Sequence, residues 1–197
     1  MKALVPFFLV ASLVVLPAAH AEEIDAIFKK VNEYIAQQNF PKALEELNWA
    51  QKEINKMHVE RLKSFFPDSL AGFTGNQTEV NAALGMTNVE RRYSNGAKNV
   101  SLSLIGGSGG GPLGNIAGFG RMAAMMGGQP GQDTFRINGL TANLVDKPNN
   151  PELTVFLDSG SMLKLEGSGQ ASGKELREIA EGFDLASLDK YLKGTAS

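Results

Sequence analysis

Side chains that could perform catalysis are scarce in this sequence. Its 197 residues include no cysteine and two histidines, His20 and His58. The lack of cysteine excludes disulfides, thiol nucleophiles and thiolate metal sites. Ser108 lies in a stretch, 106–110, that fits the G-x-S-x-G pattern of α/β-hydrolases, but that triad requires a histidine after the serine. Because His58 precedes Ser108, we predict no catalytic residue; a carboxylate-based enzyme stays an alternative.

Two glycine-rich stretches resemble phosphate-binding loops. Residues 109–114 fit G-x-G-x-x-G, but a dinucleotide site needs parallel strand–helix–strand units, and hairpin strands are expected here. Residues 167–174 miss the phosphate-loop spacing by one, and Ser172 to Glu175 is typical of a helix capping box. Three scattered carboxylates have no spacing that fixes a metal: Asp146, Asp158 and Glu166. We therefore predict no cofactor and no metal site.

A glycine- and methionine-rich insertion at 106–131 is the predicted interaction region. It holds 11 of the 22 glycines and an apolar run with helical spacing. Three interpretations stay open: a helix covering one face of the sheet, an adaptable contact for a protein partner or lipid, and a lid over a ligand pocket. The candidate interaction surface comprises Leu113, Ile116, Phe119, Met122, Met125 and Met126.

The first 21 residues have the pattern of a signal peptide. One lysine precedes an apolar run, and Ala19-His20-Ala21 has the A-x-A form that predicts cleavage after Ala21. The apolar run is shorter than the roughly 20 residues of a membrane span, so a retained anchor is the weaker interpretation. We expect an exported, periplasmic chain with no transmembrane span after cleavage.

The charge balance argues against nucleic acid as a partner. The formal charge is −2 for the whole chain, and removal of residues 1–21, which include one lysine, makes it 18 − 21 = −3. Binding to phosphate backbones relies on a basic excess or a clustered basic face, and the sequence has neither.

An antiparallel helical hairpin is predicted over residues 22–64. Ile24, Ile27, Val31 and Ile35 recur with helical spacing, and Asn39 with Pro41 marks the start of a second helix. That helix carries an apolar face of Leu44, Leu47, Gln51, Ile54 and Met57 or His58. The hairpin weakly resembles a single tetratricopeptide repeat, a resemblance that implies protein binding, through Tyr34, Phe40, Ala43, Leu47 and Ala50. The alternative is an ordinary amphipathic hairpin packed on its own domain.

Residues 65–197 are predicted to form an α+β domain. A polar, loop-like stretch is expected over 72–85, with one helical turn around Glu79 to Ala83. Five or six strands in hairpins follow, from Val89 through Glu166, with turns at Asn95-Gly96 and Asn138-Gly139, and so predict an antiparallel sheet. A C-terminal helix begins at the capping box and a short last helix ends at Gly194.

Several short motifs resemble a family of exported Gram-negative proteins of unknown function. They include Phe65-Phe66-Pro67, Glu90-Arg91-Arg92-Tyr93, Ile137-Asn138-Gly139 and Leu165-Glu166-Gly167. The resemblance implies a periplasmic location and provides no activity or site to carry over. We predict a non-enzymatic binding or protein-interaction module; its partner would be an envelope protein. The alternative is a carrier of a small apolar or lipid ligand beneath the insertion.

Overall fold

A computed structural model of the chain describes residues 18–83, 86–106 and 132–195. The predicted candidate surface, residues 113–126, lies outside these ranges. So do residues 1–17 of the predicted signal. The chain forms two compact units, Met1–His58 and Val59–Ser197.

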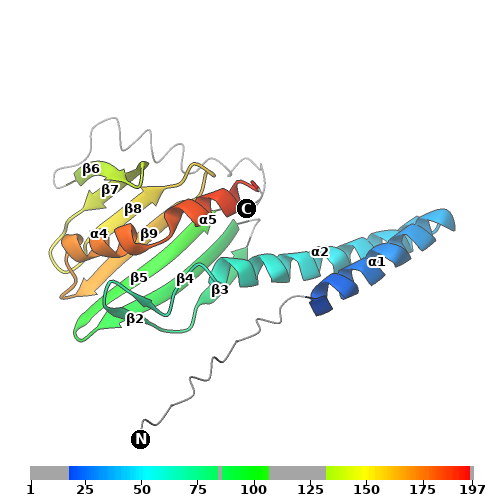
Figure 1. Cartoon of the computed structure of the whole chain (residues 1–197), viewed down its shortest axis with the longest axis horizontal. Helices are drawn as coiled ribbons and strands as arrows, with labels where there is room; N and C mark the ends of the chain where they lie inside the picture. The colour runs from blue at the N-terminus through cyan, green and yellow to red at the C-terminus, as the bar shows by residue number, and fades with distance from the viewer. Residues whose placement is uncertain (1–17, 84–85, 107–131, 196–197) are drawn as a thin grey trace, which may run out of the picture. The chain divides into compact units, whose positions relative to one another are not determined.

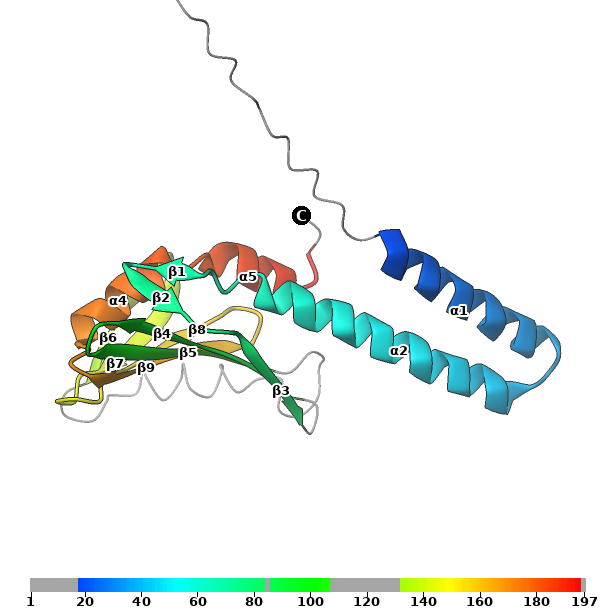
Figure 2. The ribbon, with the colours of Figure 1, turned by 90° about the horizontal axis from the view of Figure 1, so that it is seen from below.

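The first unit is an antiparallel pair of helices, as predicted (Figure 2). Helix α1 covers Ala18–Ala36 and helix α2 covers Phe40–Lys63, the last turns of which belong to the second unit. Asn39 accepts the first helical hydrogen bond of α2, from the Ala43 amide at 3.1 Å. Pro41 then lies in the first turn, where its missing N–H breaks no helical bond.

The second unit is a nine-stranded antiparallel sheet (Figure 1). Its hydrogen-bonded order is β1-β2-β4-β5-β9-β8-β7-β6, with β3 paired to β4. The strands are β1 Ser69–Leu70, β2 Phe73–Gly75, β3 Glu79–Ala83, β4 Met86–Asn95, β5 Lys98–Gly106, β6 Gln132–Ile137, β7 Leu140–Val145, β8 Glu152–Phe156 and β9 Met162–Gly169. The α+β class is therefore confirmed, and the described strands exceed the five or six predicted.

The additional strands come from the segment before β4. The helical turn predicted around residues 79–83 is wrong, because these residues form β3 and pair in register from Glu79 opposite Glu90 to Ala83 opposite Met86. Pairing with a long neighbouring strand overrides weak local preference in a polar segment.

The two Asn-Gly dipeptides close their hairpins differently. Asn138 and Gly139 are both central turn residues, with φ of 50° and 85°, because Ile137 pairs with Leu140. In the β4–β5 hairpin Asn95 pairs with Lys98, so the central residues are Gly96 and Ala97. The turn predicted at Asn95-Gly96 is thus displaced by one residue, because the register follows the buried pair Tyr93 and Val100.

Helices α4 (Gly173–Gly182) and α5 (Leu185–Leu192) lie across one face of the sheet (Figure 1). The sheet residues under them alternate with a period of two, and the helix residues above them follow one face. Leu62 and Phe66, from the end of α2 and the residues after it, join the same core. Its fully buried members include Val100, Leu102, Leu153, Val155, Leu163, Leu165, Leu176, Ile179 and Leu188.

Candidate functional site: the apolar face of the helical hairpin

Exposed large hydrophobic side chains of the described residues are concentrated on the hairpin. All of them belong to α1 or α2: Phe28, Ile35, Phe40, Leu44, Leu47, Trp49, Ile54 and Met57. Leu44 is 62% exposed and Phe40 is 58% exposed. Exposed apolar side chains are ordinary when scattered, but a contiguous set marks an interaction surface.

The buried side chains of the hairpin are small. Val31 of α1 and Ala43 and Ala50 of α2 are buried, and Ala50 is only 2% exposed. Small residues at a helix contact leave room for the neighbouring backbone, so the large side chains of α2 are not needed there. Ala43 and Ala50, the small positions of the tetratricopeptide resemblance, are thus the buried positions of α2 in the hairpin.

Six of the exposed side chains share one face of the hairpin. With 100° of rotation per residue, they lie on the same side of the buried positions Val31, Ala43 and Ala50 in both antiparallel helices. We call these six residues the hairpin face: Phe28, Ile35, Phe40, Leu44, Leu47 and Ile54. Trp49 lies on the opposite side of α2, where the Lys52 ammonium is 4.3 Å from its ring centroid. Leu44, Leu47 and Ile54 of the predicted apolar face of α2 belong to the hairpin face, and all three are exposed.

Charged groups of the hairpin lie mainly away from this face. Lys30 reaches Glu46 at 3.9 Å across the helix pair, and Lys56 lies 3.6 Å from Glu53 along α2. Residues 22–58 hold five lysines and seven carboxylates, a formal charge of 5 − 7 = −2. The hairpin is therefore mildly acidic, with an apolar face.

A pocket lies at Arg91 of β4. A pocket of about 430 Å³ is lined by Glu60, Lys63, Ser64, Phe66, Pro67, Asp68 and Arg91. Arg91 is 8% exposed, and its guanidinium donates to the carbonyls of Phe66 and Asn76 and to Asp68 Oδ1, each at 2.6 Å. The donors that point inward are thus committed to the chain itself, and we interpret this arginine as a structural anchor.

The carboxylate that pairs with Arg91 is itself exposed. The Asp68 side chain is 97% exposed, and two of the other guanidinium donors bind backbone carbonyls, those of Asn76 and Phe66. Gly75 permits this approach, since a Cβ there would lie 2.5 Å from Arg91 Nε. Tyr93 completes the cluster by donating to the Pro67 carbonyl at 3.0 Å, and burial raises the pKa of its phenol to about 12.

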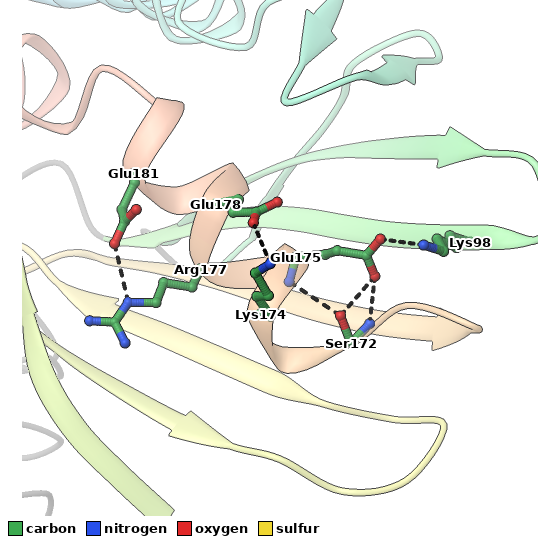
Figure 3. A network of polar contacts seen from close by, with 7 residues as sticks. All are labelled: Lys98, Ser172, Lys174, Glu175, Arg177, Glu178 and Glu181. Atoms are coloured by element: carbon green, nitrogen blue, oxygen red, sulfur yellow. Dashed lines mark hydrogen bonds and ion pairs between the residues drawn. The ribbon is translucent and has the colours of Figure 1, made fainter.

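The predicted capping box is present at the start of α4. Ser172 Oγ accepts from the Glu175 amide at 3.4 Å, and the Glu175 carboxylate accepts from the Ser172 amide at 2.9 Å (Figure 3). The same carboxylate accepts from Lys98 Nζ of β5 at 2.5 Å, and that bond holds the pKa of Glu175 below its usual value. Lys174 instead pairs outward with Glu178 at 3.6 Å. The loop before α4 is therefore built to cap a helix and join it to β5.

The other residues weighed from the sequence do not come together. Among the carboxylates, Glu166 pairs with Lys164 and Asp158 with Lys193, while Asp146 lies beside Gly173. Within residues 18–83, 86–106 and 132–195, no three histidine or carboxylate side chains are grouped to hold a metal. His58 lies on α2, and partial burial lowers its pKa. Ser108 lies outside the described residues.

No described helix has both the length and the apolar content to cross a bilayer. Comparison with protein-family models, with curated proteins and with solved structures gives no match. Among the described residues, the hairpin face is therefore the candidate functional site.

Proposed function

We propose that this chain is an exported protein-interaction module and that the hairpin face is its contact surface. The observation that carries the proposal is the concentration of exposed large hydrophobic side chains on α1 and α2, whereas the second unit buries its own. Apolar surface of this kind is stabilised when a partner covers it. The tetratricopeptide resemblance of the hairpin supports the same role.

The periplasm is the proposed location, because residues 1–21 have the composition and A-x-A ending of a cleaved signal. The resemblance to exported Gram-negative proteins supports this location. We assign no catalytic role to any residue: the ionisable side chains described above make local structural pairs. The insertion at 106–131 remains a predicted second contact region.

Site-specific photo-crosslinking in the cells that express the chain tests the contact surface. A photoreactive amino acid replaces Leu44 on the hairpin face, and the matched control places it at Trp49, which is 51% exposed on the opposite side of α2. We expect protein adducts from position 44 and few from position 49. Equal yields at both positions would overturn the choice of surface.

Deletion of 106–131 distinguishes the insertion from the hairpin. If the hairpin face carries binding, the deleted chain still gives the adduct at position 44. If the adduct disappears while the deleted chain stays folded, the insertion is required for contact. An apolar ligand retained by the intact chain in mass spectrometry under native conditions would instead favour the carrier alternative.

A further inference from the structure

The hairpin face has the spacing of a helix-bundle core. The apolar residues of α2 form two adjacent seams, each repeating every seven residues. The first seam is Ala43, Ala50 and Met57, and the second is Phe40, Leu47 and Ile54. On α1, Phe28 and Ile35 are also seven residues apart. Seven-residue repeats keep a seam facing a neighbouring helix. Ala43 and Ala50 of the first seam are buried, whereas all three side chains of the second seam are exposed. A bundle with two further helices requires such an exposed seam.

We propose that the hairpin face binds the same face of a second copy, forming a four-helix bundle of two hairpins. This inference rests on the proposed function and names its partner. A twofold dimer requires a self-complementary patch, because each group meets its own counterpart or a symmetry-related neighbour. The hairpin face is apolar and the residues at its margin are mostly amides, so both can contact an identical surface.

Polar residues beside the hairpin face are mostly uncharged amides. Asn32, Asn48, Gln51 and Asn55 are exposed and lie next to it on the helical projection. An amide both donates and accepts hydrogen bonds, so two copies of the same amide can pair. Asp25, near the start of α1, is the nearest charged residue at this margin. Face-to-face approach therefore brings few like charges together.

The apolar area matches that of an ordinary protein dimer. Six large side chains at roughly half exposure present about 400–500 Å² per copy. A stable interface buries about 800 Å² per partner, of which somewhat more than half is apolar. The hairpin face and its amide margin together supply this amount.

Charge argues against a lipid surface as the occupant. Helices that bind membranes in their plane carry lysine and arginine beside the apolar face, which attract anionic lipids. Here the hairpin has a formal charge of −2, and amides occupy that position. The sheet edge β6 is also less suited to self-pairing, because it presents the exposed charged residues Asp133 and Arg136.

Sedimentation velocity of the purified exported chain over a wide concentration range tests the proposal. We expect a monomer–dimer equilibrium. Leu44→Lys combined with Leu47→Lys places like charges in the interface and should weaken dimerisation by on the order of 100-fold. The matched control, Trp49→Lys, removes an exposed aromatic residue from the opposite side of α2 and should change dimerisation by less than about threefold.

Circular dichroism distinguishes a loss of dimerisation from a loss of folding, and hydrogen exchange locates the interface. If far-UV circular dichroism shows that the double variant has lost its helices, Leu47→Ala replaces it, and we expect dimerisation about tenfold weaker. Hydrogen exchange should slow in α1 and in the part of α2 up to His58 on dimerisation. Slowing confined to residues of the sheet would overturn the proposal.

A chain that stays monomeric at every concentration, or dimers that both variants and control affect equally, would overturn the inference. Face-dependent photo-crosslinks to a different protein would then leave the proposed function standing. Loss of both the dimer and the face-dependent crosslinks would remove the proposed function as well.

Discussion

The hairpin and the sheet unit place apolar side chains in opposite ways. The sheet unit buries leucines, isoleucines and valines between the strands and α4, α5, while the hairpin buries alanines and exposes leucine, isoleucine and phenylalanine. A layer of strands covered by helices encloses a core, whereas two helices form one contact line and leave the rest of each surface outside. The hairpin therefore carries surface that only another element can bury.

The largest expected effect is in the core of the sheet unit. Leu165→Ala on β9 should lower the free energy of unfolding by about 3 kcal/mol, because it removes buried methyl groups and leaves a cavity. Leu44→Ala, the same change on the hairpin face, should alter it by less than about 0.5 kcal/mol at concentrations that favour the monomer. Chemical denaturation measures both. Equal losses would mean that the hairpin face is covered within the monomer.

The next effect concerns Arg91, whose three donors join β4 to the segments before and after β2. Arg91→Lys keeps the charge but loses the planar fork, and should cost about 2 kcal/mol of unfolding free energy. The adjacent Arg92 pairs with Glu90 at the surface, so Arg92→Lys should cost less than about 0.5 kcal/mol. Comparable losses would contradict the anchoring role.

A smaller effect should separate the two seams of α2. Ala50→Leu adds volume at a buried position of α2, and we expect a cost of about 1.5 kcal/mol in thermal or chemical unfolding of the hairpin helices. Gln51→Leu adds the same kind of side chain at an exposed position and should leave monomer stability unchanged. A tolerated Ala50→Leu would show that the hairpin contact is loose.

The smallest expected effect depends on pH. The bond from Lys98 lowers the pKa of Glu175 in the folded state, so its contribution to stability is complete above the ordinary glutamate pKa of 4.5. That contribution is lost as the pH falls through the folded value. Glu175→Gln should therefore be less stable than the unchanged chain at pH 7, and the difference should shrink below pH 4.5. Unfolding free energies measured from pH 7 to pH 3 test this, with the surface residue changed in Glu178→Gln as the control.

Much of the second unit could be predicted from local pattern. Alternation at Val100, Leu102 and Leu104 predicts strand β5, and Ser172 with Glu175 predicts the start of α4. Both predictions succeed because side-chain period and helix capping depend on residues close together in the sequence. Strand β3 was missed because its pairing with β4 is what defines it. The anchoring role of Arg91 could not be predicted from the sequence, because its hydrogen-bond partners lie 15 to 25 residues away along the chain.

By itself, the sequence determined the α+β class, the helical hairpin and the stripes of small and large residues on α2. Only the tertiary structure decided which stripe α1 covers. Leu47 and Ala50 both have helical spacing, and a pattern alone cannot say which faces a neighbour. Packing of two helices favours the small stripe, and the large side chains remain exposed.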